Sequence, residues 1–175
     1  MAEAAIAGVP PDGIEIDVLA ESPLWTGLPE AEALAVRAVL AALGAVPEEV
    51  PTPAEMSITL TDDAHIQVLN REWRDMDKPT NVLSFPAPEL PEDVDGAPQP
   101  MGDVIVAYET LAREADLDGK RMEHHLIHLV VHGTLHLLGY DHIEDDEAEE
   151  MEGLERQILA GLGIDDPYRL PQDGG

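Results

Sequence analysis

The sequence contains no cysteine among its 175 residues. Disulfides, iron–sulfur clusters and thiolate zinc sites are therefore excluded, and any metal must be bound by His, Asp or Glu. Basic residues are also few: 9 stand against 37 acidic ones, which gives a formal net charge of −28. This charge disfavours long-range attraction to nucleic acid or anionic lipid, although it leaves room for a local basic patch. Aromatic residues make up only 3%, which argues against a surface built from stacking platforms.

No apolar run approaches the roughly 20 residues that a membrane helix needs. The N-terminus lacks the positive region and long apolar core of a secretory signal, so we expect a soluble, cytoplasmic protein. The length and the 44% of hydrophobic residues suit one packed domain. We predict a flexible leader over 1–12, a single domain over 13–168 and a flexible tail over 169–175.

Alternating and short apolar runs predict four strands, at 14–18, 56–60, 82–85 and 103–107. Helical patterns cover 30–43, 62–73, 108–115, 120–138 and 145–162, and Thr61 is the expected N-cap of the second helix. The proline-rich stretch 86–100 reads as a solvated loop or a flexible lid beside a site. The fold class is therefore α+β, a single small mixed sheet of about four strands flanked by helices.

The segment 120–138 is apolar on nearly every face, which predicts a buried central helix. His132 and His136 lie four residues apart on it, about one turn, so both can point at one metal ion. Gly139 predicts a left-handed helix end, beyond which His142 can arrive as a third ligand. Three imidazoles with an open fourth position are typical of a catalytic zinc site, where the pKa of a bound water falls to about 7.

Other polar residues near this motif are open to two interpretations. His128 lies one turn before His132 and is either a partner that orients a metal ligand or a hydrogen-bonded core histidine. Asp141 is a proton-transfer group, a solvated turn residue or a helix-capping group. For His124 we expect a hydrogen-bonded core role. We expect no role at a site for His125 and His65.

The ligand spacing matches that of metzincin metalloproteases. Those enzymes require a glutamate directly after the first histidine as general base, whereas this chain has Gly133 there. A peptidase that uses the usual mechanism is therefore disfavoured.

The motif from His132 to His142 resembles the signature of the YbeY family of bacterial endoribonucleases, the rRNA maturation factors. The segments 70–86 (NREWRDMDKPTNVLSFP) and 102–105 (GDVI), and the acidic continuation after His142, resemble further blocks of that family. The resemblance spans about residues 14–168.

This resemblance implies a zincin-like fold with the metal site on the central helix. It implies one ion, usually zinc, bound by His132, His136 and His142. It implies cleavage of single-stranded RNA, in maturation of the 16S rRNA 3′ region and in ribosome quality control. The implied partners are small ribosomal subunit proteins, with no membrane and no DNA. Three histidines do not fix the metal, because nickel and copper also suit imidazole.

A family arginine important for function matches Arg74. Arg71, Arg74 and Lys78 lie close together in the sequence, and Lys120 and Arg121 open the metal helix. We expect Arg74 to act on phosphate, with Arg71 and Lys78 as possible phosphate contacts. The alternative is that the two arginines pair with neighbouring acids on a surface helix. The acidic run 144–152 is expected to be a solvated helix start; a magnesium site there is a lesser possibility.

Three other functions remain in view. The first is a metzincin-like metalloprotease, and the second is a non-catalytic ribosome-assembly factor with a structural metal. The third, a metal-storage or sensing module, would need more ligands or a partner domain than the sequence offers.

Overall fold

The computed structural model describes residues 13–51, 53–87, 98–140, 144–164 and 166–167. The predicted leader over 1–12 and tail over 169–175 lie outside these residues, as do Asp141 and His142. Four strands form one sheet in the order β1-β2-β4-β3. The strands are β1 (Ile14–Ala20), β2 (Ala54–Thr61), β3 (Val82–Pro86) and β4 (Gln99–Ala107). β1, β2 and β4 run parallel, and β3 is antiparallel to β4. The mixed four-stranded sheet confirms the predicted α+β class.

β4 is longer than the pattern predicted. It begins at Gln99 rather than Asp103, because Gln99 continues the parallel pairing opposite Ala54. β3 likewise continues to Pro86, which pairs with Gly102. The segment predicted as a loop over 86–100 is thus shortened from both ends by strand pairing, and residues 88–97 lie outside the described part.

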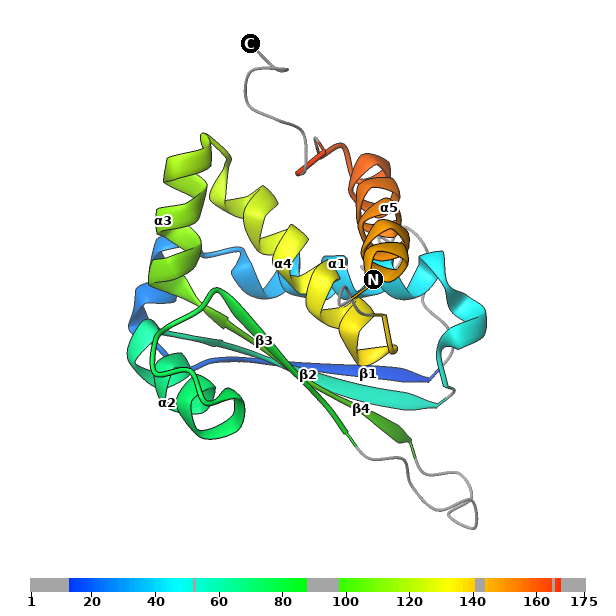
Figure 1. Ribbon diagram of the computed structural model, residues 1–175, viewed down its shortest axis with the longest axis horizontal. Coiled ribbons are helices and arrows are strands. Elements are labelled where there is room, and N and C mark those ends of the chain that lie inside the picture. The colour runs from blue at the N-terminus through cyan, green and yellow to red at the C-terminus, as the bar shows by residue number, and fades with distance from the viewer. Residues whose placement is uncertain (1–12, 52, 88–97, 141–143, 165, 168–175) are drawn as a thin grey trace.

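Helices cover both faces of the sheet unequally. α1 (Ala31–Ala45), α3 (Tyr108–Asp118), α4 (Met122–Leu137) and α5 (Asp145–Gly161) lie on one face, and α2 (Asp63–Arg74) lies on the other (Figure 1). Two short 3-10 helices, η2 (Pro23–Gly27) and η3 (Pro47–Glu49), flank α1. The main core fills the space between the sheet and the larger group of helices. A smaller core joins α2 to the other face, through Ile66, Leu83, Ile105 and Ala107.

The predicted N-cap of α2 was wrong by one residue. The cap is Asp62, whose side chain accepts a hydrogen bond from the backbone N–H of His65 at 2.9 Å. Thr61 instead ends β2, and its carbonyl accepts the indole N–H of Trp25 at 2.8 Å. The Asp62 carboxylate is a good acceptor for the backbone N–H groups at the start of a helix. Thr61 is buried, and its backbone carbonyl is the acceptor for Trp25 in the core.

α4 is the buried central helix that the sequence predicted. Leu126, Val130 and Leu135 are fully buried, and the helix packs against α1, α3, α5, β3 and β4. It ends at Leu137, and Gly139, two residues further on, has a left-handed φ of 104° as the sequence predicted. Within the described residues, no helix is both long and apolar enough to cross a membrane.

Candidate metal centre

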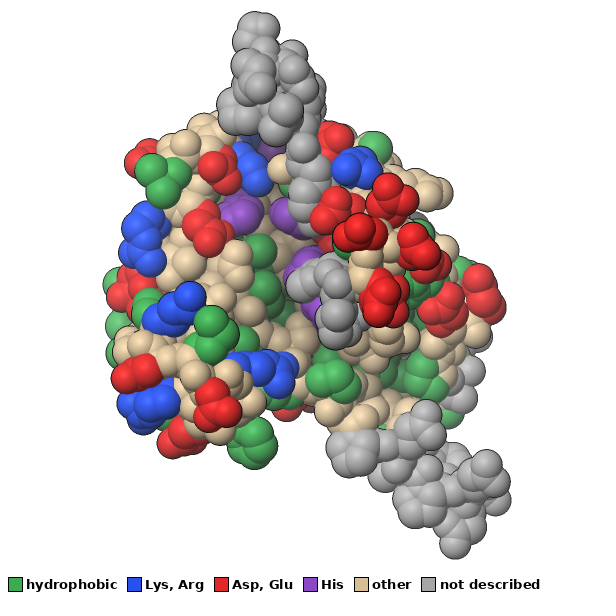
Figure 2. Space-filling view, in the orientation of Figure 1, with side chains coloured by type: hydrophobic (Ala, Val, Ile, Leu, Met, Phe, Trp, Pro, Cys, Tyr) green, Lys and Arg blue, Asp and Glu red, His purple; other side chains and the backbone are tan. Residues whose placement is uncertain are grey.

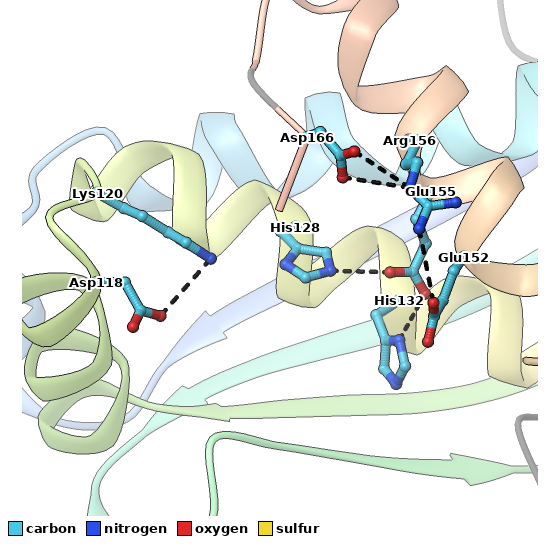
Figure 3. Close-up of polar contacts among 8 residues, drawn as sticks. All are labelled: Asp118, Lys120, His128, His132, Glu152, Glu155, Arg156 and Asp166. Carbon is cyan, nitrogen blue, oxygen red and sulfur yellow. Dashed lines mark hydrogen bonds and ion pairs between the residues drawn. The ribbon is translucent and has the colours of Figure 1, made fainter. Parts of the chain in front are cut away.

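A buried glutamate joins two histidines of α4. Glu155 of α5 is fully buried, and its two carboxylate oxygens contact different rings (Figure 3). One oxygen lies 2.6 Å from Nδ1 of His132, and the other lies 2.8 Å from Nε2 of His128. A carboxylate without water around it is costly unless it is hydrogen-bonded, and these two imidazoles meet that need.

The contact also indicates which ring nitrogen of His132 would bind a metal. Because a carboxylate accepts, Nδ1 is the donor in this contact, and Nε2 is the ring nitrogen through which His132 would bind a metal. Histidines that bind metals commonly donate their second ring N–H to a carboxylate in this way. The donor set at His132 therefore fits a metal ligand, and His128 shares the group that orients it.

His136 lies beside His132 on the same face of α4. The two ring centroids are 4.7 Å apart, and the ring planes are nearly perpendicular, at 82°. Both side chains are only partly buried. His142 and Asp141 lie outside the described residues, and within the described ones no group of three potential ligands forms. Two of the three predicted ligands are thus adjacent, and the third stays a prediction.

The remaining histidines have other roles. His125, rather than His124, is the core histidine: it is 5% exposed, and its Nε2 lies 2.8 Å from Glu114. Burial lowers the pKa of His125 below 6.5, against the opposing effect of Glu114. His124 is half-buried, and His65 is exposed on α2, 3.8 Å from Glu21.

Gly133 lies where α4 packs directly against the sheet. A Cβ at this position would come within 2.8 Å of Cγ1 of Val104 and 3.2 Å of the hydroxyl of Ser84. A glutamate could not occupy the position without moving β4 away from the helix. The close packing gives a physical reason for the residue that separates this motif from that of the metzincins.

The packing leads to a prediction about two helical glycines. Gly133→Ala should destabilise the protein by about 1–3 kcal/mol, because the new methyl group overpacks the contact with Val104. Gly153→Ala in α5 should instead stabilise it by about 0.5–1 kcal/mol, since nothing lies within 4 Å of a Cβ there. Urea unfolding of both variants measures the difference. Equal effects of the same sign would contradict the close approach at Gly133.

Arg74 ends α2 at the edge of the sheet. Its guanidinium donates a hydrogen bond to the carbonyl of Ser84 at 2.7 Å and lies 5.0 Å from the ring centroid of Phe85. The hydroxyl of Ser84 lies 3.4 Å from the carbonyl of Gly133, the residue after His132. β3 thus links Arg74 to α4, and within the described residues Arg74 contacts no carboxylate.

The other basic residues of the two motif segments are arranged differently. Arg71 lies 3.7 Å from Asp77, as the alternative interpretation of this helix expected. Lys120 and Arg121 each face an acid of their own segment, at 3.8 Å from Asp118 and 3.6 Å from Glu123. Lys78 is exposed. Arg74 differs from them in that the groups holding it, the Ser84 carbonyl and the Phe85 ring, are neutral.

The histidines lie at the bottom of a hollow in the molecular surface. Figure 2 shows Lys and Arg side chains interspersed with Asp and Glu on the side of α2 and α3, and Asp and Glu side chains concentrated on the side of α5. The acidic side is the start of α5, where Glu144 and Glu147 form a capping box as expected for a solvated helix start. The hollow therefore lies between a wall of mixed charge and an anionic one.

A family model described as endoribonuclease YbeY matches residues 29–163. The chain belongs to this family. The endoribonuclease YbeY of Azorhizobium caulinodans is 68% identical over 161 residues, which cover 92% of this chain and all of that protein. The YbeY of Bradyrhizobium diazoefficiens is 56% identical over 154 residues, 87% of this chain and 84% of that one. A solution structure of a Thermotoga maritima protein is 25% identical, with a TM-score of 0.48, over 89% of this chain and 99% of that one.

Membership of the YbeY family confirms the resemblance drawn from the histidine motif. Within the matched residues, Glu155 is the site residue that the sequence analysis missed. One signal was available: Glu155 occupies the apolar stripe of α5, between Met151 and Ile158, where a charged residue is out of place.

Proposed function

We propose that this chain is a metal-dependent endoribonuclease that cuts single-stranded RNA, acting in maturation of the 16S rRNA 3′ region and in ribosome quality control. The endoribonuclease activity is supported by membership of the YbeY family. The observation that supports the metal dependence is the 2.6 Å contact between Glu155 and Nδ1 of His132, because metal-binding histidines commonly donate one ring N–H to a carboxylate.

The metal would be held by His132, His136 and His142, and we propose one zinc ion, with nickel or another divalent ion as alternatives. When bound, such an ion supplies Lewis-acid chemistry and lowers the pKa of a coordinated water. Glu155 keeps the His132 ring in one orientation and one tautomer, with the proton on Nδ1. His128 satisfies the second oxygen of the carboxylate.

Arg74 is the group best placed to act on the phosphate. Its guanidinium is fixed by the Ser84 carbonyl and by the Phe85 ring, so it binds an anion without first leaving a carboxylate partner. A preorganised cation beside the scissile phosphate stabilises the negative charge that develops on the phosphate oxygens. Arg71 and Lys78 would contact flanking phosphates.

Two nucleophiles are compatible with these residues. Attack by water would leave a terminal phosphate and a free hydroxyl. Attack by the RNA 2′-hydroxyl would leave a 2′,3′-cyclic phosphate. Mass spectrometry of the cleaved ends distinguishes them.

The high negative charge supports a role for partners. A chain with a net charge of −28 has little general affinity for RNA, and what it has should weaken steeply with salt. We propose that small ribosomal subunit proteins, in the cytoplasm, help to deliver the rRNA. A pulldown from ribosome-containing extract that yields no ribosomal or ribosome-assembly protein would contradict this part.

The protease alternative is disfavoured by the packing around Gly133, which leaves no room for the glutamate that metzincins use. A non-catalytic assembly factor with a structural metal remains the competing function. It predicts that loss of a metal ligand unfolds the protein rather than inactivating a folded one.

The test is cleavage of a single-stranded RNA from the 16S 3′ region by the zinc-loaded protein, with the same sequence as a duplex for comparison. Arg74→Ala should reduce cleavage about 100- to 1000-fold, the loss that follows removal of one group stabilising a transition state. Arg37→Ala is the control. It removes an exposed cation from α1, which lies on the face of the sheet opposite α2, and it should leave the rate unchanged. An inert wild type, or equal rates for the two variants, would contradict the proposal.

A further inference from the structure

The last turn of α2 places a large aromatic ring on the surface. Trp73 is 66% exposed, whereas the second tryptophan of the chain, Trp25, is 4% exposed and hydrogen-bonded within the core. Met76, in the turn that follows α2, is also exposed, at 45%. In a chain with six aromatic residues of the Phe, Trp and Tyr types, placing one tryptophan outside the core is notable because core burial is the usual use of such a ring.

The ring does not stand alone. Trp73 packs edge-on against Phe85, with ring centroids 6.1 Å apart and planes at 66°. Phe85 in turn lies under the guanidinium of Arg74. We call Trp73, Arg74 and Phe85 the α2 aromatic cluster. Because its members hold one another, a ligand that binds there loses little affinity to the ordering of side chains.

The cluster lies across the edge strand from the histidines. Successive side chains of a strand point to opposite faces. Ser84 of β3 accordingly reaches toward α4 and Gly133, and Phe85 packs with the core of α2. The guanidinium of Arg74 is bound to the Ser84 carbonyl, at the edge between these faces. A chain that passes from the histidines around the edge of β3 would meet Arg74 first and Trp73 next.

The segment around the cluster repels an anionic chain less than the rest of the protein does. Residues 71–78 carry three basic and three acidic side chains and are therefore neutral, in a protein whose net charge is −28. Within this segment Arg74, directly beside the exposed ring, is held by the Ser84 carbonyl and the Phe85 ring rather than by an acid. An aromatic face next to a guanidinium is the combination that single-stranded nucleic acids bind, by base stacking and phosphate contact.

We propose that Trp73 is a stacking platform for one unpaired base of the RNA substrate, on the far side of Arg74 from the metal ligands. The inference rests on the proposed ribonuclease function and deepens it. It gives a physical reason for single-strand specificity, because the faces of a base within a duplex are covered by neighbouring base pairs. One platform is enough, which agrees with the low aromatic content of the chain.

The test uses the fluorescence of the two tryptophans in the full-length, zinc-loaded protein. The probe is a short single-stranded 2′-O-methyl RNA of the 16S 3′ region. Binding should quench the exposed Trp73, while buried Trp25 serves as an internal reference. Trp73→Phe should remove the quenching and keep most of the affinity. Trp73→Ala should weaken single-strand binding about 5- to 100-fold, the range for loss of one stacked base, with little effect on a duplex of the same sequence.

Leu19→Ala is the matched control, since Leu19 is 58% exposed on β1, the opposite edge strand of the sheet. It should change neither quenching nor affinity. Wild-type affinity in a folded Trp73→Ala variant would overturn the platform while leaving the ribonuclease function intact. The same result combined with lost capture of a ribosomal protein would reassign the cluster to a protein partner. A wild type that neither binds nor cuts RNA would overturn both proposals.

Discussion

Replacement of Glu155 by glutamine is expected to lower the zinc affinity of the protein about 10- to 100-fold, the usual cost of losing a group that orients a metal-binding histidine. A glutamine has one acceptor oxygen and one donor group, so it cannot accept from both His128 and His132. Where the amide N–H₂ faces Nδ1 of His132, the ring proton moves to Nε2, and the nitrogen that should bind the metal is blocked.

Glu152→Gln is the matched control for this substitution. Glu152 lies almost one turn earlier on α5, is 37% exposed at the side chain, and pairs with Arg156 at 3.9 Å (Figure 3). Both variants remove one negative charge, but only Glu155 touches the histidines in the described structure. Competition with a chromophoric chelator gives the two affinities, and thermal unfolding in EDTA shows whether the metal-free fold survives. Equal zinc affinities would contradict the assigned role of Glu155.

Replacement of His136 by alanine is expected to reduce RNA cleavage about 1000-fold, which corresponds to about 4 kcal/mol of lost transition-state stabilisation. The fold should survive, because the His136 side chain is only partly buried and the core of α4 is formed by its neighbours, among them Leu135. Single-turnover cleavage measures the loss, and circular dichroism measures the fold.

His124→Ala provides the comparison within the same helix. His124 is also partly buried on α4 but lies three turns before His136. It should keep full activity and full metal content. If His136→Ala unfolds the protein whereas His124→Ala does not, the metal is structural, and the result favours the non-catalytic assembly factor.

Much of the fold could be predicted from local patterns. Alternation located the strands, and the apolar character of 120–138 identified the central helix, because both periodicities follow directly from backbone geometry. The predictions that were wrong concern features that depend on a contact with a residue distant in the sequence. β4 extends to Gln99 because β2 pairs with it, and His125 rather than His124 is buried because α3 supplies Glu114. Neither partner is visible in the local sequence.

The candidate site likewise contains residues that local sequence could predict and residues that it could not. The spacing of His132, His136 and Gly139 is a local property of one helix and its end, so the sequence could predict it. Glu155 could not be assigned from spacing, since it lies 23 residues after His132 and meets it only through the packing of α5 on α4. Gly133 was identified as an unusual residue, but the structure was needed to show that Val104 and Ser84 leave no space for a side chain there.

We propose that the histidines of α4 bind one metal ion and that RNA cleavage depends on it. The most direct measurement is the metal content of the purified protein together with its cleavage of single-stranded 16S 3′-end RNA, before chelation, after chelation and after zinc is restored. We predict about one metal per chain, loss of cleavage on chelation with the fold retained, and recovery with zinc. Cleavage that continues at the same rate in the metal-free, folded protein would contradict the account.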